Sequence, residues 1–255
     1  MTRIELSGEK FNDFIRCLTN LKDKCNDVDI KDGFIRQRSN DLTSVFEMDL
    51  TSLIETATIP LSNIKNKLEL FKTFVGQDIV IDIVEGATED ESYYTVADTI
   101  SSIKFNFPLL EFMDNKYMSQ EELYNIFDLN DEDLILNTDL VSSITEKIKT
   151  VAFIFNTPAI QIKFNNSQAA ISAATQSKDQ YAVFKKEIEM NMEFTGNYSS
   201  NLSTIPFTIE HDNKLVFKMY KDPTQNVSLN KISSTLGDVN INIYSRSAIM
   251  EESGE

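Results

Sequence analysis

The predicted elements of this chain occur in the same order twice. Each half opens with a strand-like run and an amphipathic helix, and each later contains a Thr-Ile-Pro triplet followed by Lys-Leu and Phe-Lys. These segments are Arg3–Leu6, Glu9–Lys22 and Thr58–Lys72 in the first half, and Leu134–Asn137, Asp139–Lys149 and Thr204–Lys218 in the second. Solenoid repeats have periods of about 20 to 50 residues, and this period is far longer. The order therefore predicts two similar domains.

Alternation of apolar and polar residues predicts most of the first half to be strands. Ser7 is the expected N-cap of the first helix. A second helix is expected at Leu61–Phe74, with Gly76 as its C-terminal cap. The predicted strands after the first helix are Val28–Ile30, Phe34–Arg38, Ser44–Leu50, Ile54–Ile59, Asp78–Val84, Tyr93–Ala97 and Ser102–Phe107, with turns at Asp32-Gly33 and Asn40-Asp41.

The second half contains one segment with two interpretations. Compared with Leu61–Phe74, residues 214–221 would be a helix. Taken as a strand, Lys214–Lys221 restores the three strands that a complete second domain needs, with Pro206–Asp212 as a short helix, and we prefer this interpretation. The other predicted strands are Leu134–Leu136, Ala159–Phe164, Ala169–Ala174, Tyr181–Met190, Val227–Ser233 and Val239–Ser245, while Asn191–Ser203 has no assignable pattern.

Pro108 ends the strand pattern of the first half, and an acidic segment follows it. The expected organisation is an N-terminal domain at 1–108, a connector at 109–133, a C-terminal domain at 134–250 and an acidic tail at 251–255. The expected fold class is α+β, with two helices packed on antiparallel sheets in each domain.

Composition limits the possible functions. The formal net charge of −16 argues against a protein that binds nucleic acid in an open basic groove. No apolar run is long enough to cross a membrane, and Met1–Glu5 lacks the apolar core of a signal peptide, so we expect a cytoplasmic protein. Cys17 and Cys25 are expected to be reduced thiols.

Catalytic signals are weak throughout the sequence. His211 is the single histidine, and no nucleophile motif or phosphate-binding glycine loop accompanies it. The acidic pairs Asp27/Asp29, Glu89–Glu91 and Asp131–Asp133 lack the glycine and terminal glutamate of a calcium loop, which favours a role in solubility. We therefore expect no enzyme activity, no cofactor and no metal.

Basic residues lie on the polar faces of the predicted helices. Arg16 and Lys24 lie opposite Phe11 and Leu18 at 100° per residue. Lys65, Lys67 and Lys72 flank the apolar stripe of the second helix. On the third helix Lys149 lies opposite the apolar face, with Lys147 at its edge. Any one of these is expected to be simply solvated, but together they carry more weight, because a strongly acidic chain places bases on its helices.

Two domains with the same order of strands and helices, an acidic connector and basic helix faces in an acidic chain together resemble the DNA polymerase sliding clamps. The segment from Asp27 to Leu50 is similar to the strand–turn–strand region of proliferating cell nuclear antigen. Asn213–Ser245 resembles the last strands of T-even phage clamps, and Ser247–Glu252 resembles the apolar-then-acidic tail of the nuclear antigen. The composition, rich in Lys and Asn and without Trp, suggests a phage or other viral source.

The resemblance implies a closed homotrimeric ring that encircles double-stranded DNA and binds a DNA polymerase and a clamp loader. Edge strands would join neighbouring subunits, and helices would line the bore. The residues expected to face DNA are Lys10, Arg16, Lys24, Lys65, Lys67, Lys72, Lys147 and Lys149. Those expected to form a groove for partner peptides are Leu109, Leu110, Phe112, Ala248, Ile249 and Met250.

Two alternatives remain open at this point. Gln120–Phe127 resembles the Gln-x-x-aliphatic-x-x-aromatic-aromatic peptide by which replication proteins bind sliding clamps, but a connector helix that packs Leu123, Ile126 and Phe127 onto the body is preferred. The alternative function is an acidic, β-rich structural protein of a virion with a duplicated domain. Such a protein has no reason to place its bases on helices.

Overall fold

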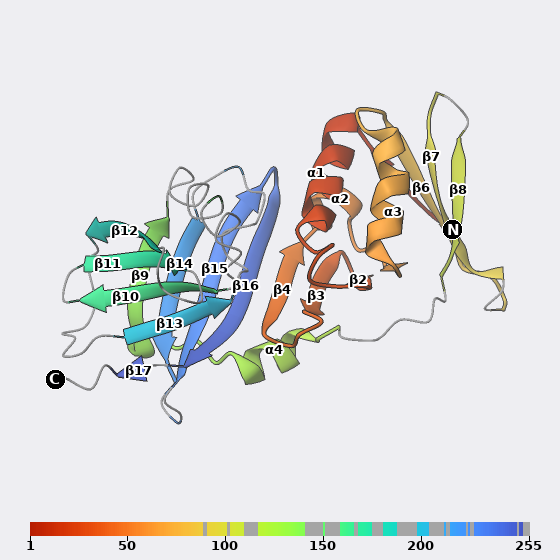
Figure 1. Ribbon diagram of the computed structural model, residues 1–255. Coiled ribbons are helices and arrows are strands. Elements are labelled where there is room, and N and C mark those ends of the chain that lie inside the picture. Colours follow the sequence, from red (N-terminus) through yellow and green to blue (C-terminus); the bar gives the residue numbers. More distant parts are fainter. Residues whose placement is uncertain are drawn as a thin grey trace. The chain divides into compact units, whose positions relative to one another are not determined.

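The computed structural model divides the chain into two compact units (Figure 1). Unit 1 is Met1–Gln120 with Thr235–Ile241, and unit 2 is Glu121–Ser234 with Asn242–Glu255. The structure describes residues 1–88, 91–100, 103–109, 117–140, 150, 159–165, 168–174, 181–187, 198–203, 212, 215–222, 224, 227–248 and 250–251. Each unit is built on antiparallel sheets, as the α+β prediction requires.

Unit 1 contains a four-stranded sheet with the order β1-β6-β7-β8. Its strands are β1 (Thr2–Leu6), β6 (Ile79–Val84), β7 (Tyr93–Asp98) and β8 (Lys104–Pro108). The apolar side chains of β1 alternate with exposed polar ones, so that Ile4 and Leu6 are buried, which is the pattern of a sheet with one face in the core. Strands β1 and β8 are the two edges of this sheet.

The second sheet of unit 1 has the order β5-β2-β3-β4. Its strands are β2 (Val28–Lys31), β3 (Phe34–Arg38), β4 (Ser44–Asp49) and β5 (Ile59–Leu61). The predicted Asp32-Gly33 turn joins β2 to β3, and both residues have positive φ, 52° and 78°, as a two-residue hairpin turn requires. Pro60 of β5 lies opposite Asp29 of β2. A proline, which has no N–H to donate, is tolerated there because β5 is an edge strand.

Two helices lie side by side in unit 1, α1 (Gly8–Thr19) and α3 (Ile64–Phe71) (Figure 1). Ser7 is the N-cap of α1, and its side chain accepts a hydrogen bond from the Lys10 backbone, which confirms the predicted start. A 3₁₀ turn, η1 (Lys72–Phe74), follows α3, and Gly76 comes after it with φ of 81°, the conformation expected at a helix C-terminus.

Aromatic rings join these helices to the β1-β6-β7-β8 sheet. Phe11 on α1 contacts Phe71 on α3, with ring centroids 6.2 Å apart. Phe71 in turn meets Phe107 of β8 at 6.0 Å, and Phe107 stacks on Tyr94 of β7 at 5.0 Å. Burial of aromatic rings is the largest apolar contribution that single side chains make to a core. The α1–α3 pair is thereby fixed against the edge strand β8.

Unit 2 contains a five-stranded sheet and further strands that pair with one another, two of which extend into the Thr235–Ile241 segment of unit 1. The five-stranded sheet has the order β12-β11-β10-β13-β17, and β16, β15, β14 and β9 are also neighbours in that order. The bounds are β9 Leu134–Leu140, β10 Ala159–Asn165, β11 Gln168–Ala174, β12 Tyr181–Glu187, β13 Tyr198–Ser203, β14 Leu215–Lys221, β15 Val227–Leu236, β16 Val239–Ala248 and β17 Met250–Glu251. Strand β12 is an edge of the five-stranded sheet.

The structure tests several of the sequence predictions for the second half of the chain. Residues 215–221 form a strand, which confirms the preferred interpretation of this segment. Strand β13 lies in a segment that had no assignable pattern. Asp139 and Leu140 belong to β9, so the predicted helix cannot begin at Asp139; its residues 141–149, like residues 204–211, lie outside the described residues.

The predicted strand at Ile54–Ile59 is wrong. Thr51–Ile54 instead forms a short helix, α2, and β5 begins only at Ile59. The cause is the side chain of Asp49, which accepts hydrogen bonds from the Thr51 backbone at 3.1 Å and from its hydroxyl at 2.6 Å. Such a turn competes with strand pairing at the end of β4.

Candidate functional site

The outer faces of α1 and α3 carry the basic residues that the sequence analysis predicted to contact DNA. Phe11, Phe14 and Leu18 of α1 are buried, so Lys10 and Arg16 remain on the outer face. Burial of Ile64, Leu68 and Phe71 likewise leaves Lys65 exposed on α3, followed by Lys72 in η1. We call these four solvent-facing bases, Lys10, Arg16, Lys65 and Lys72, the α1–α3 surface.

Each base of the α1–α3 surface has a partner of its own. Arg16 pairs with Asp13 at 3.2 Å and Lys65 with Asp23 at 3.4 Å. Lys72 pairs with Glu69, and the Lys10 ammonium donates to the Ser52 carbonyl oxygen at 3.1 Å. Exposed pairs of this kind contribute at most about 1 kcal/mol. The bases can therefore exchange their carboxylates for phosphate oxygens at small cost.

Lys24 lies beyond α1, because the helix ends at Thr19 rather than at the predicted Lys22. Its charge acts on Asp41, in the turn between β3 and β4. Burial alone would raise the pKa of Asp41, but hydrogen bonds from Ser39 and Thr43 and the charge of Lys24 together lower it. Lys24 therefore acts on a turn of unit 1, and its predicted contact with DNA stays a prediction.

Lys67 does not lie on the surface as predicted. Its exposed fraction is 6%, and its ammonium lies 5.7 Å from the ring centre of Tyr94 and 5.1 Å from that of Phe107. Lys67 follows Ile64 by three residues and precedes Phe71 by four, so the helical repeat places it in the buried stripe. The expectation that Lys67 faces DNA is corrected on this ground.

The residues predicted for a partner-peptide groove are only partly described. Leu109 follows β8 and is half-buried, Ala248 ends β16, and Met250 begins β17. Leu110, Phe112 and Ile249 lie outside the described residues, as do Lys147 and Lys149 of the predicted DNA contact. The groove is therefore not defined by the described residues.

The Gln120–Phe127 segment packs onto its own unit. Gln120–Ile126 forms helix α4, and Leu123 and Phe127 are buried. The Phe127 ring lies 5.4 Å from that of Tyr244 on β16, and Arg246 donates to the Ile126 carbonyl oxygen at 2.7 Å. These contacts agree with the preferred interpretation of the motif as a packed connector helix.

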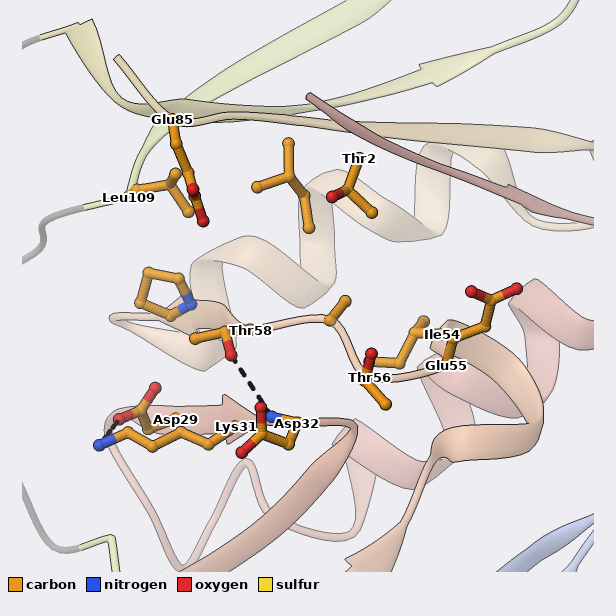
Figure 2. A pocket seen from close by; sticks show the side chains of 13 residues that line it. Thr2, Asp29, Lys31, Asp32, Ile54, Glu55, Thr56, Thr58, Glu85 and Leu109 are labelled. Carbon is orange, nitrogen blue, oxygen red and sulfur yellow. Dashed lines mark hydrogen bonds and ion pairs between the residues drawn. The ribbon is translucent and has the colours of Figure 1, made fainter. Parts of the chain in front are cut away.

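Unit 1 also contains a pocket of about 690 Å³ that the sequence analysis did not find (Figure 2). One wall comes from β1, β6 and the end of β8, and the other from β2, its turn and the segment before β5. We call it the acidic pocket, and it is lined by Thr2, Asp29, Lys31, Asp32, Ile54, Glu55, Thr56, Ala57, Thr58, Pro60, Ile83, Glu85 and Leu109.

The described residues that line the acidic pocket include four carboxylates and one ammonium group. Lys31 pairs with Asp29 at 3.0 Å, and its ammonium also lies 4.6 Å from the Tyr117 ring centre. Burial raises the pKa of Asp29, and the hydrogen bond and charge of Lys31 oppose that rise. The sequence analysis assigned Asp29 to surface solubility, and its pairing with Pro60 of β5 becomes visible only in the structure.

The described residues contain no group of three or more His, Cys, Asp or Glu side chains that could hold a metal ion. The described part of the chain has no helix long and apolar enough to cross a membrane.

Comparisons with known proteins identify the fold. No protein-family model matches the sequence, and no curated protein matches it. The structure is similar to PCNA from Thermococcus kodakaraensis, with a TM-score of 0.66 and 10% identity over 97% of this chain and 99% of that chain. It is also similar to the PCNA2–PCNA3 complex from Sulfolobus tokodaii, with a TM-score of 0.64 and 12% identity over 96% and 99%. The chain therefore has the fold of PCNA over nearly its whole length.

Proposed function

We propose that this protein is a DNA sliding clamp, a ring that encircles duplex DNA and tethers a DNA polymerase during synthesis. The observation that carries the proposal is the fold, which matches PCNA over 97% of this chain and 99% of the matched one. In this proposal the protein acts without catalysis and without a cofactor.

The charge of the α1–α3 surface suits a ring better than a groove. A groove binder is held on DNA by its direct contacts alone, and it needs many uncompensated bases to neutralise phosphates. A closed ring is retained by topology, so that weak contacts independent of sequence are enough. The α1–α3 surface provides four bases beside the carboxylates of Asp13, Asp23 and Glu69, which suits sliding.

The edge strands provide a means to close the ring. Within the described residues, β8 pairs only with β7, and β12 pairs only with β11. An unpaired edge offers a row of backbone donors and acceptors to another chain. We propose that β8 of one copy pairs with β12 of the next to give a homotrimer, and that the polymerase and the clamp loader bind near Leu109 and the Ala248–Met250 tail.

The first test combines native mass with a replication assay. Light scattering should give three times the chain mass of 29.1 kDa. The protein should also increase the product length of a DNA polymerase on primed circular DNA when a clamp loader is present. A monomer that leaves product length unchanged would contradict the proposal and favour a structural protein of a virion.

The second test reverses two bases of the α1–α3 surface. Lys65→Glu with Lys72→Glu should shorten the replication products and leave the trimer mass unchanged. Because each lost phosphate contact reduces the salt dependence of binding by roughly one unit of slope, retention on circular DNA should also become less sensitive to salt. The matched control is Lys218→Glu with Lys221→Glu, which makes the same change in net charge on strand β14 of unit 2. Equal losses in both pairs would contradict the role of the helices.

A further inference from the structure

We propose that the acidic pocket of unit 1 binds a lysine or arginine side chain from an extended segment of a partner protein. This site is separate from the residues assigned to DNA and from those assigned to the polymerase groove, apart from Leu109 at its rim. The inference goes beyond the proposed clamp function, and the pocket can be tested on the isolated protein.

The shape of the acidic pocket is the first argument. Figure 2 shows Thr2 and Glu85 on one wall, and Asp32, Glu55 and Thr56 on the facing wall. The volume of about 690 Å³ lies within the range of roughly 300 to 1,000 Å³ found for ligand pockets. A space of this size accommodates several atoms of a ligand side chain together with its backbone.

The charge of the acidic pocket is the second argument. Lys31 forms an ion pair with Asp29, and its ammonium also lies over the Tyr117 ring. No ion pair within the described part of the chain involves the carboxylates of Asp32, Glu55 or Glu85. Like charges around one cavity repel, and a cation in that cavity relieves the repulsion. The ligand is therefore expected to carry a positive charge.

The residues that line the pocket favour a basic side chain over a metal ion as the ligand. The side chains of Ala57, Pro60 and Ile83 are buried along the pocket, whereas Glu55, Glu85 and Asp32 are exposed around it. Lysine and arginine combine an apolar stem with a charged end, and they bury the stem while the charge remains at a polar rim. A metal ion needs several carboxylates at one point, and the described residues contain no such group.

The pocket wall formed by the hairpin turn and the segment before β5 is fixed by two hydrogen bonds. The Gly33 amide donates to the Ala57 carbonyl oxygen at 3.0 Å, and the Asp32 amide donates to the Thr58 hydroxyl at 3.3 Å. A Cβ atom on Gly33 would stand 2.0 Å from the Glu55 carbonyl oxygen. The segment before β5 is therefore held closely against the hairpin turn. When a pocket wall is already fixed, less of the binding free energy is lost to ordering of the protein.

The test uses a fluorescein-labelled pentapeptide, Gly-Arg-Gly-Arg-Gly, and fluorescence anisotropy at physiological salt. Glu55→Gln with Glu85→Gln should weaken binding about tenfold, because two nearby charges are lost. Lys31→Gln should strengthen it about threefold, since a competing cation is removed. The matched control, Glu121→Gln with Glu132→Gln, makes the same change in net charge in unit 2 and should alter affinity less than twofold.

Two further arms distinguish the occupant. The same peptide with citrulline in place of arginine keeps the shape without the charge and should fail to bind. Calcium added at constant ionic strength should not displace the labelled peptide. Equal weakening by the pocket pair and the control pair, binding of the citrulline peptide, or displacement by calcium would each overturn the proposal. Circular dichroism of every variant verifies the fold, and trimer mass and product length report separately on the clamp function.

Discussion

The α1–α3 surface and the acidic pocket belong to the same unit but differ in how far their charges are paired. On the α1–α3 surface, Arg16, Lys65 and Lys72 each have a carboxylate within salt-bridge distance. Among the described residues that line the acidic pocket, Lys31 is the only base beside four carboxylates. A surface with compensated charge releases an anionic ligand easily, whereas a cavity with uncompensated charge selects a cation.

The difference also concerns rigidity. The bases of the α1–α3 surface extend from exposed helix positions, and their pairs are solvated. The pocket is enclosed by strands and by a turn whose backbone approaches the Glu55 carbonyl oxygen closely. Mobile bases suit contacts that must form and break as DNA moves, and a fixed wall suits one preferred ligand. The following changes test this contrast, beginning with the largest expected effect.

Gly33→Ala should have the largest effect on stability. Gly33 has φ of 78°, and a Cβ atom there would stand 2.0 Å from the Glu55 carbonyl oxygen, so the pocket wall must move. We expect the free energy of unfolding to fall by about 3 kcal/mol, measured by urea denaturation, with loss of peptide binding in the pocket.

Gly76→Ala is the matched control for this change. Gly76 has φ of 81°, but a Cβ atom there would meet no atom within 4 Å. Its cost should be that of the left-handed backbone alone, about 1 kcal/mol. Equal losses for the two variants would mean that the contact between the hairpin turn and Glu55 contributes nothing to the pocket wall.

Lys67→Ala tests which bases of α3 are structural. Lys67 is buried and its ammonium lies near the rings of both Tyr94 and Phe107, so its removal should lower the free energy of unfolding by roughly 2 kcal/mol. The exposed neighbour Lys65, changed to Ala, should alter stability by less than about 0.5 kcal/mol. Retention on circular DNA should show the reverse order of effects. Normal stability together with weak DNA retention in Lys67→Ala would return Lys67 to the DNA-contacting set.

The sequence predicted those features that depend on neighbouring residues. Ser7 caps α1 through the Lys10 backbone only three residues away, and the Asp32-Gly33 turn joins strands that are adjacent in the chain. The strand at Leu215–Lys221 followed from the count of elements in each half. The burial of Lys67 could also have been predicted from the sequence, because the helical repeat places it on one face with Ile64, Leu68 and Phe71.

The acidic pocket could not be predicted in this way. Thr2, Glu55 and Glu85 are far apart in sequence, and the pairing of β1 with β6 and of β2 with β5 builds the two walls on which they lie. Periodicity identifies the buried face of a strand but not its partner strand. The short helix α2 also depended on one side chain, that of Asp49, which ends β4 by bonding to Thr51.

The smallest effects should come from pH, through two aspartates that differ in environment. Burial raises the pKa of Asp29 in the pocket, so the folded state holds its proton more tightly than the unfolded state does. This contribution stabilises the fold at low pH, and it is lost as pH rises from the ordinary value of 3.8 through the raised one. Asp29→Asn should therefore remove a fall in stability with rising pH.

Asp41 should behave in the opposite sense. Burial opposes its ionisation, but hydrogen bonds from Ser39 and Thr43 and the charge of Lys24 prevail and lower its pKa. Its contribution is present above the ordinary value of 3.8 and is lost as pH falls through the lowered one. Urea denaturation of wild type, Asp29→Asn and Asp41→Asn between about pH 3 and pH 6 compares these slopes. Slopes of the same sign for both aspartates would contradict the distinction between a carboxylate set by burial and one set by hydrogen-bond donors.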